Sequence, residues 1–382
     1  MLPKKLQDKL NQRQAENALR KLAATSDLID FSSNDYLGFA KSETIFFRAS
    51  EILKERNLIQ NGATGSRLLS GNHPLYPEAE AMIASIHKSE AALIFNSGYD
   101  ANVGFFSCVP QRGDVILYDE FAHASIRDGI RMSMAKAYKF PHNDLEELNR
   151  KCQAERSRSS AHNEIYLITE SVFSMDGDSP DLSRMAEISI NFDAKLIVDE
   201  AHALGVLGEK ALGLVDDLNL SDSVFARLIT FGKALGGHGA AILGSELLKS
   251  YLVNFSRSLI YTTGLPPHSL ATVMAGFEQL QRLPEHEKLG ENIVFFRSEL
   301  EKFGLQNYFL ESQSAIQSAI ILGNERVKAI SQKLKEEGFD VKPILSPTVP
   351  AGSERLRFCL HSYNTQVEIS EVLRLLATFA QV

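Results

Sequence analysis

The sequence has no tryptophan and only three cysteines, Cys108, Cys152 and Cys359, among its 382 residues. The cysteines are far apart and form no Cys-x-x-Cys pair, which favours reduced thiols in a cytoplasmic protein over a disulfide framework. The sequence also lacks any apolar run near the roughly 20 residues that a membrane-spanning helix needs. Its first residues contain no apolar signal-peptide core. We therefore predict a cytoplasmic protein that does not associate with membranes.

Positive charge is also scarce, since 40 Lys and Arg stand against 48 Asp and Glu and the formal net charge is −8. An acidic chain without a basic run argues against non-specific binding of nucleic acid. Taken alone, the net charge would also disfavour anionic ligands. Hydrophobic residues make up 44% of the chain, so its composition and length suit one large core and one smaller core.

Short apolar runs alternate with stretches of helical patterning between about residues 75 and 270. Strands buried on both faces and separated by helices indicate an α/β fold with a mostly parallel sheet. The predicted strands are Ala91–Asn96, Val115–Tyr118, Ala137–Phe140, Ile165–Thr169, Lys195–Asp199, Leu228–Phe231 and Ala240–Gly244.

The pattern predicts three parts: an N-terminal helix and strand segment over 1–45, a large domain over 46–275, and a small α+β domain over 276–382. A helix is expected at 1–24 and a strand at Leu28–Phe31. The polar stretch Lys151–Asn163 is predicted to be a surface loop. In the small domain we expect helices at about 276–302, 325–337 and the C-terminus, with strands near 315–322, 340–345 and 354–360.

Charged and glycine-rich segments follow three of the predicted strands. The strand Lys195–Asp199 runs directly into DEAHALGVLG, which places Asp199 and His202 at its carboxyl end. Lys233 follows the strand Leu228–Phe231, within TFGKALGG. The carboxyl ends of strands are where ligands bind in open α/β sheets. Asn96-Ser-Gly98-Tyr99 also follows a strand and opens a helix, whose backbone N–H groups could hold a phosphate.

An acid, a lysine and a phosphate-binding helix start are what pyridoxal 5′-phosphate (PLP) requires. The lysine forms an imine with the cofactor, and the carboxylate keeps the pyridine nitrogen protonated so that the ring accepts electrons. The alternative for Lys233 is that its side chain is a solvated charge on the protein surface. His123 and His142 could each be a core residue or a helix cap. Walker and dinucleotide motifs are missing, and no His/Cys cluster has the spacing of metal ligands.

Ten motifs in order along the chain carry a family resemblance. They are NDYLG, GSRLLSG, SGYDAN, HASIRDG, HND, ESVFSMDGD, DEAHALGVLG, TFGKALGGHGA, YTTGLPP and PTVPAGSERLR. Together they resemble the α-oxoamine synthases, fold-type I PLP enzymes that condense an amino acid with an acyl thioester and release carbon dioxide. The resemblance implies a large domain with a mostly parallel sheet, a small C-terminal domain and a homodimer with shared active sites.

The resemblance also implies roles for individual residues. Lys233 would bind PLP covalently and then remove the Cα proton, Asp199 would pair with the pyridinium nitrogen, and His123 would stack on the ring. With His202 these form the expected catalytic group. The further cofactor contacts implied are Ser174 and His202 near the phenolic oxygen, and Thr230 with the backbone of Gly98 and Tyr99 at the phosphate.

Other implied residues would contact the substrates or the partner subunit. Thr262 or Thr263 would reach the phosphate of the neighbouring subunit. Arg357 would bind the amino-acid carboxylate with Asn34 nearby, and Arg20 would lie near the acyl substrate. The alternative for Arg20 is a solvated helix face.

The segments TFGK, GAAILGS, LIYTTGLPP and PTVPAGSERLR favour the branch that uses L-alanine and a pimeloyl thioester, carried on coenzyme A or a carrier protein. A sister enzyme that uses glycine or serine is the nearest alternative. A non-catalytic scaffold subunit and a nicotinamide-dependent oxidoreductase are more distant ones. Tyr76, Ala79 and Ala211 depart from the usual family pattern, and Ala211 stands where glycine is common.

Overall fold

The computed structural model describes residues 2–16, 18–19, 22, 27–158 and 163–380. The chain divides into two compact units. Unit 1 comprises Met1–Ser33, Met175–Asp178 and Leu289–Val382, and unit 2 comprises Asn34–Ser174 and Ser179–Lys288. Arg20 lies outside the described residues.

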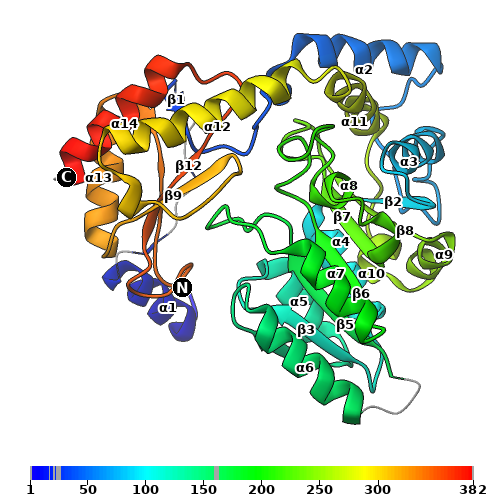
Figure 1. Ribbon diagram of the computed structural model, residues 1–382. Coiled ribbons are helices and arrows are strands. Elements are labelled where there is room, and N and C mark those ends of the chain that lie inside the picture. Colours follow the sequence, from blue (N-terminus) through cyan, green and yellow to red (C-terminus); the bar gives the residue numbers. More distant parts are fainter. Residues whose placement is uncertain (1, 17, 20–21, 23–26, 159–162, 381–382) are drawn as a thin grey trace. The chain divides into compact units, whose positions relative to one another are not determined.

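Unit 2 is built on a seven-stranded sheet (Figure 1) with strand order β2-β8-β7-β6-β5-β3-β4. Strand β8 runs antiparallel to both of its neighbours and the remaining pairs are parallel. The α/β fold class and the mostly parallel sheet are therefore confirmed. The strands are β2 (Ala91–Phe95), β3 (Val115–Asp119), β4 (Lys136–Phe140), β5 (Ile165–Glu170), β6 (Lys195–Asp199), β7 (Ala226–Thr230) and β8 (Ala240–Gly244).

Helices cover both faces of this sheet because successive strand residues point to opposite sides. Ile116 belongs to one hydrophobic cluster, whereas Val115 and Leu117 belong to a second. The helices that contribute to the first cluster are α4 (Gly98–Cys108), α5 (Ala124–Met132), α9 (Glu246–Phe255) and α10 (Arg257–Ile260). Those that contribute to the second are α6 (Leu145–Arg158), α7 (Leu182–Asn191) and α8 (Leu214–Asp217). Two-sided burial explains why the strands are continuously apolar.

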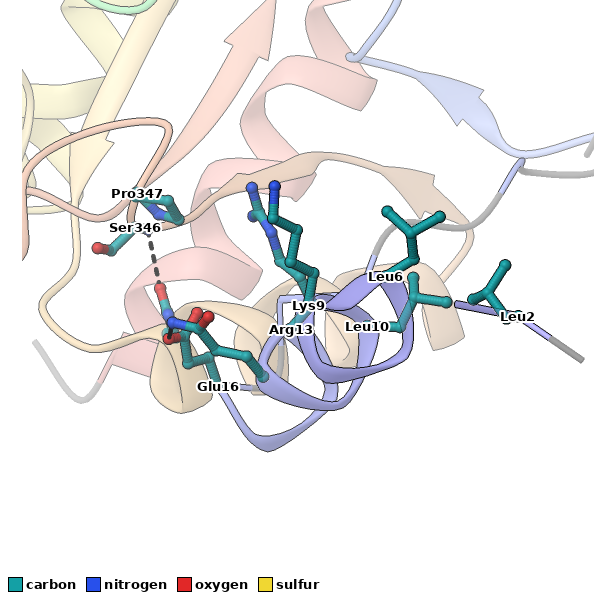
Figure 2. Close-up of a pocket in the computed structure, with 10 residues that line it drawn as sticks. Leu2, Leu6, Lys9, Leu10, Arg13, Glu16, Ser346 and Pro347 are labelled. Atoms are coloured by element: carbon teal, nitrogen blue, oxygen red, sulfur yellow. Dashed lines mark hydrogen bonds between the residues drawn. The ribbon is translucent and has the colours of Figure 1, made fainter. Parts of the chain in front are cut away.

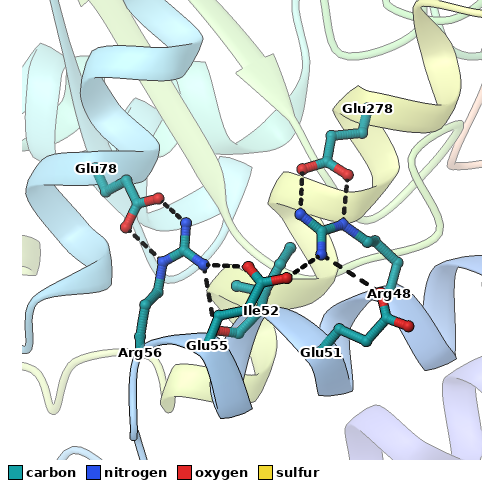
Figure 3. Close-up of polar contacts among 7 residues, drawn as sticks. All are labelled: Arg48, Glu51, Ile52, Glu55, Arg56, Glu78 and Glu278. Carbon is teal, nitrogen blue, oxygen red and sulfur yellow. Dashed lines mark hydrogen bonds and ion pairs between the residues drawn. The ribbon is translucent and has the colours of Figure 1, made fainter.

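Three further helices of unit 2 are α2 (Glu43–Glu55), α3 (Leu75–Ile86) and α11 (Pro267–Leu280). Figure 3 shows an ion-pair network that joins them. Arg48 on α2 pairs with Glu278 on α11 at 2.7 Å, and Arg56 pairs with Glu78 on α3. Such partly exposed pairs each contribute about 1 kcal/mol or less, so the network mainly fixes how these helices pack.

Unit 1 contains a three-stranded antiparallel sheet of order β11-β12-β9 and a parallel pair of β1 and β10. In the part of the chain that the structure describes, no helix is long and apolar enough to cross a membrane. The strands are β1 (Ile29–Asp30), β9 (Ile316–Ile320), β10 (Phe339–Asp340), β11 (Lys342–Ile344) and β12 (Arg355–Cys359). The helices are α1 (Lys4–Ala15), α13 (Asn324–Glu336), α14 (Gln366–Ala380) and the part of α12 (Pro284–Lys302) from Leu289 onward.

Three local predictions are wrong. The helix expected over 1–24 is shorter, because α1, which lines the pocket in Figure 2, ends at Ala15. Residues 151–158 continue helix α6 instead of forming a loop, because Cys152 extends the buried stripe of Leu145 and Leu148 while the polar residues face solvent. The helix expected over 276–302 is two helices. α11 ends at Leu280, and the backbone at Leu283 is left-handed with φ 65° directly before α12.

His87 at the end of α3 is a buried histidine that the sequence patterns did not single out. It is 1% exposed, neither ring nitrogen has a hydrogen-bond partner among the described residues, and its ring packs edge-on against Phe277. Burial, together with the charge of Arg227, holds the pKa of His87 well below its usual value. The ring is therefore neutral at pH 7.

This burial predicts a loss of stability in mild acid. The unfolded chain protonates His87 below about pH 6.5, so it binds more protons than the folded chain and stability falls by up to about 1.4 kcal/mol per pH unit. Thermal unfolding at pH 7.5 and pH 5.5 should show a smaller acid-induced decrease for His87→Gln than for the wild-type protein. Equal decreases for the two proteins would contradict the prediction.

Candidate active site

Three predicted strands of unit 2 end at the same edge of the sheet with polar residues. Asp199 is the last residue of β6, Thr230 the last of β7, and Glu170 the last of β5. Helix α4 begins at Gly98, directly after β2. Asp199 and Thr230 are 6% and 9% exposed, so the edge is buried enough to strengthen interactions between charges.

Asp199 is held by two donors. Its Oδ1 accepts a hydrogen bond from the Ala201 backbone N–H at 2.9 Å, and its Oδ2 accepts one from Asn102 Nδ2 on α4 at 2.8 Å. The Asn102 amide also donates to Ser125 Oγ at 3.0 Å, and that hydroxyl lies 2.7 Å from His123 Nδ1. Asp199 and His123 are thus joined by a chain of two polar side chains, which orients both of them.

His123 is the N-cap of α5, because its Nδ1 accepts a hydrogen bond from the Ser125 backbone N–H. The helix-cap reading is therefore correct for this histidine, and the position also brings the ring to the site. Burial lowers the pKa of His123, and Asp199 opposes this shift while Lys233 adds to it. Because the charges of Asp199 and Lys233 both shift the pKa of His123, these three predicted residues lie in one electrostatic environment.

His142, the other histidine left open, contacts a neighbouring acid and an aromatic ring. Its Nδ1 lies 2.9 Å from Asp119 Oδ1, and its ring stacks on Phe121 with centroids 4.4 Å apart. His142 is therefore a packing residue that these two contacts hold in place.

Glu170 is a site residue that sequence reasoning missed, although its motif was recognised. It is 3% exposed, and its Oε1 accepts the backbone N–H of His123 at 2.6 Å. Burial, and then the negative charge of Asp199, raise the pKa of Glu170 well above its usual value. This shift favours the neutral form of the Glu170 carboxyl at pH 7. Asn102 and Ser125 were also missed, because an amide and a hydroxyl carry no signal until the fold brings them to Asp199.

Lys233 lies half-buried in a tight glycine-rich turn after β7. Gly236 has φ 60°, and a β-carbon there would lie 2.2 Å from the backbone nitrogen of Ala40. Only glycine fits this approach. The turn therefore fixes where Lys233 leaves the backbone.

The start of α4 forms a cradle with Thr230. The Ser97 side chain caps the helix by accepting the Asp100 backbone N–H at 3.0 Å. A β-carbon at Gly98 would lie 3.7 Å from Thr230 Oγ1, so the glycine keeps open the space between the hydroxyl and the helix start. First-turn N–H groups and a hydroxyl are suitable ligands for an anion.

The segment that carries Thr262 and Thr263 is tied to this cradle. Asn96, two residues before Gly98, donates from Nδ2 to Thr262 Oγ1 at 3.2 Å and to the Thr263 carbonyl at 2.6 Å. Asn96 was not predicted as a site residue. The motif allowed its neighbours Gly98 and Tyr99 to be predicted from their place at a helix start. The contacts of Asn96 itself depend on the fold.

His202 is 6% exposed, and its Nδ1 lies 2.7 Å from the Tyr36 hydroxyl. Tyr36 is fully buried and donates to Asn34 Oδ1 at 3.2 Å. The predicted residues His202 and Asn34 are therefore joined through Tyr36, which sequence reasoning did not select.

The remaining predicted residues are less closely tied to the cluster. Ser174 is half-buried after β5. The Tyr99 hydroxyl donates to Asp128 Oδ2 at 2.8 Å, so its side chain points to α5 while its backbone belongs to the α4 start. Arg357 is 7% exposed on β12 of unit 1. Its role in substrate binding stays a prediction, as does that of Arg20.

Comparisons with known proteins agree with this geometry. Residues 26–376 match the family described as Aminotransferase class I and II. The 8-amino-7-oxononanoate synthase of Emericella nidulans is 40% identical, with 99% of this chain and 97% of that protein covered.

Two solved structures share the fold. Serine palmitoyltransferase of Sphingomonas wittichii has a TM-score of 0.89 at 26% identity, covering 100% of this chain and 98% of that one. The 8-amino-7-oxononanoate synthase of Francisella tularensis has a TM-score of 0.77 at 29% identity, covering 92% and 97%. Both named enzymes are α-oxoamine synthases. The chain therefore belongs to the class I and II aminotransferase family, within its α-oxoamine synthase branch.

Proposed function

We propose that the protein is an 8-amino-7-oxononanoate synthase, which uses PLP to condense L-alanine with a pimeloyl thioester in biotin biosynthesis. The observation that supports the proposal is that Asp199 is linked to His123 by a chain of hydrogen bonds, while the charge of Lys233 acts on the same histidine. The 40% identity over nearly the whole chain to a relative of that name favours this member of the branch over one that uses glycine or serine.

The residues present suit PLP. Asp199 is a buried carboxylate with two donors that keep it oriented, as a partner for a pyridinium nitrogen requires. The backbone N–H groups at the start of α4 and the hydroxyl of Thr230 at the end of β7 would bind the phosphate. Lys233 would hold the cofactor covalently, and the bound cofactor supplies an electron sink for charge that develops at the alanine Cα.

The chain's own residues do the rest of the chemistry. Lys233 Nζ removes the proton from Cα and later returns one, which makes it the general base and acid of the reaction. The Asp199 carboxylate would keep the ring nitrogen of the cofactor protonated, and the raised pKa of Glu170 favours the neutral form of that neighbouring carboxyl. His123 would cover the ring face, and His202 with Ser174 would bind the phenolic oxygen. Holding both substrates in place supplies much of the rate increase.

The substrate contacts extend beyond this cluster. Arg357 would pair with the alanine carboxylate, with Asn34 nearby, and Arg20 would contact the far carboxylate of the pimeloyl group. Each of these ion pairs would select for the carboxylate of one of the two substrates.

A homodimer is part of the proposal. Unit 2 exposes several large apolar side chains on α2 and the segments that follow it, which monomeric proteins rarely leave uncovered. These residues are Phe46, Phe47, Ile59, Leu68 and Leu69, which are 51–101% exposed. Across the dimer, Thr262 or Thr263 would reach the phosphate of the partner's cofactor.

The function is tested by product analysis. Purified holoenzyme is given L-alanine, glycine or serine with pimeloyl-coenzyme A, and we expect 8-amino-7-oxononanoate and carbon dioxide from alanine alone. A change in the cofactor absorbance with alanine should accompany turnover. If glycine or serine were used in preference to alanine, the assignment within the branch would be wrong.

Asn96 offers a test of the phosphate cradle. Asn96→Ala removes both hydrogen bonds to Thr262 and Thr263, so we expect the dissociation constant for PLP to rise about tenfold, since one to two hydrogen bonds contribute about 1–1.5 kcal/mol. Titration of the apoenzyme with PLP by absorbance measures it. Asn254→Ala is the matched control, because that amide donates to a helix carbonyl on α9. Equal affinity for all three proteins would rule out the role.

A further inference from the structure

The N-cap of α5 is an imidazole, whereas a hydroxyl, a carboxylate or an amide is the usual side chain at this position. The Ser125 backbone N–H donates a hydrogen bond to His123 Nδ1 at 3.2 Å. A backbone N–H can only donate, so Nδ1 is an acceptor and carries no proton. The proton of the His123 ring therefore lies on Nε2, and the ring is neutral.

The side chain of Ser125 supports the same assignment. Its Oγ lies 2.7 Å from His123 Nδ1 and accepts a hydrogen bond from Asn102 Nδ2 at 3.0 Å. The second N–H of the Asn102 amide donates to Asp199 Oδ2 at 2.8 Å. Because the Ser125 oxygen accepts from Asn102, its own proton is free to bind Nδ1. His123 Nδ1 thus accepts two hydrogen bonds, one from the backbone and one from the hydroxyl of the same serine.

These bonds are shielded from water, whereas the histidine is not. Ser125 and Asn102 are 1% and 4% exposed, so their polar groups need partners inside the protein. His123 is exposed, and its ring hydrogen bonds with the described residues are those at Nδ1. The buried chain therefore fixes one nitrogen of the ring, and Nε2 remains available as a donor.

A proton on Nδ1 would be costly. The Ser125 N–H and hydroxyl would both lose their acceptor, and α5 would lose its N-cap. Burial has the largest effect on the pKa of His123 and lowers it, while the nearby charges act in both directions. The charged groups around the residue are Asp199, Lys233, Arg127 and Asp128, together with Glu170 at its backbone N–H. Because these charges oppose one another, burial and the two donors at Nδ1 favour the neutral ring.

We propose that Ser125 is a positioning residue that fixes His123 as the neutral tautomer with its proton on Nε2. This role rests on the proposed function, in which His123 covers the ring of the cofactor. A neutral imidazole adds no positive charge beside Lys233 and the protonated pyridine nitrogen, and it gives the site one donor of fixed position. His123 cannot then act as a base through Nδ1, which leaves the transfer of the Cα proton to Lys233.

The tautomer can be observed without turnover, by nitrogen NMR of the wild-type protein with isotope-labelled histidine. The apoenzyme and the holoenzyme are both recorded, and the signals of His123 are assigned by their absence from His123→Asn. We expect a donor-type signal for Nε2 and an acceptor-type signal for Nδ1 in both forms at pH 7.5. A proton on Nδ1, or an imidazolium at this pH, would overturn the proposal.

The variants Ser125→Cys and Ser125→Ala test the hydroxyl, because cysteine keeps a weak donor and alanine keeps none. The titration of His123 should move to higher pH in the order Ser, Cys, Ala, since each change weakens a hydrogen bond to the neutral ring. The acid limb of the kcat profile should move in the same order. We expect kcat of Ser125→Ala at pH 7.5 to fall roughly two- to tenfold, as for the loss of one hydrogen bond.

Ser245→Ala is the matched control. Ser245 caps α9 by accepting the Leu248 N–H at 3.1 Å, and it follows the end of β8 that lies at the opposite edge of the sheet from Thr230. This variant should keep the wild-type titration of His123 and the wild-type kcat. If Ser125→Ala left both the tautomer and the titration of His123 unchanged, Ser125 would not be a positioning residue. A wild-type enzyme that showed the expected tautomer but made no product from alanine, glycine or serine would instead refute the proposed function.

Discussion

Lys233→Ala is expected to abolish turnover, with a loss of at least ~10³-fold in kcat. The substitution removes both the covalent attachment of the cofactor and the base that moves the Cα proton, and general base catalysis alone contributes about 10²–10⁴-fold. Initial rates with alanine and pimeloyl-coenzyme A measure the effect. Borohydride reduction followed by peptide mapping should place the cofactor label on Lys233 in the wild type and leave the variant unlabelled.

Lys210→Ala is the control for this prediction. Lys210 is exposed in the loop after β6 and should tolerate the change with unaltered kcat. The fold of Lys233→Ala should be intact, because Lys233 is only half-buried in its turn. A folded Lys233→Ala enzyme that kept substantial activity would refute the assignment of this lysine.

The fold was predictable from the sequence where one physical pattern dominates. Two-sided burial makes the strands of unit 2 continuously apolar, and glycines mark the turns that deliver Asp199 and Lys233 to the sheet edge. The prediction of a surface loop failed at Cys152. The burial of this one thiol keeps its polar neighbours in a helix. Ala211, which stands where glycine is common, has φ 56°, and so the departure from the family pattern coincides with a left-handed backbone.

The candidate site was predictable to the extent that its residues carry chemistry of their own. Asp199 and Lys233 were predicted from the residues because an acid and an amine at one sheet edge suggest a cofactor, whereas the role of His123 was implied only by the family resemblance. Glu170 and Tyr36 were missed because their roles come from contacts with residues distant in sequence. Net charge was misleading about ligands, since anion binding depends on local features such as the α4 start and not on the surface as a whole.

Arg227→Met is expected to lower the free energy of unfolding by roughly 3–5 kcal/mol, as when one partner of a buried ion pair is removed. Arg227 and Glu200 form such a pair, with side chains 5% and 0% exposed. Burial already raises the pKa of Glu200 even though Arg227 opposes the shift. Without the guanidinium, the carboxylate would have to be buried unpaired or take up a proton.

The pair also holds the loop that carries His202. Glu200 Oε1 accepts the Val215 backbone N–H at 3.1 Å, and Arg227 donates to the Leu212 carbonyl. A β-carbon at Gly213 would lie 2.6 Å from Glu200 Oε1, so the loop closes tightly on the carboxylate. Loss of Arg227 should therefore loosen the backbone behind the active site as well as lower the melting temperature, by on the order of 10 °C.

The pH dependence separates an unpaired charge from a simple packing defect. In Arg227→Met the pKa of Glu200 would rise further, so the folded variant binds a proton that the unfolded chain releases, and its stability falls as pH increases. The deficit relative to wild type should consequently be larger at pH 8 than at pH 5.5 in thermal unfolding. The comparison is made in the His87→Gln background, because Arg227 also lowers the pKa of His87. Adding Glu200→Gln to Arg227→Met in that background removes the titrating group, and the deficit relative to the His87→Gln parent should then not depend on pH. If the single variant's deficit did not change with pH, the cost would come from lost packing of the arginine stem rather than from a buried charge.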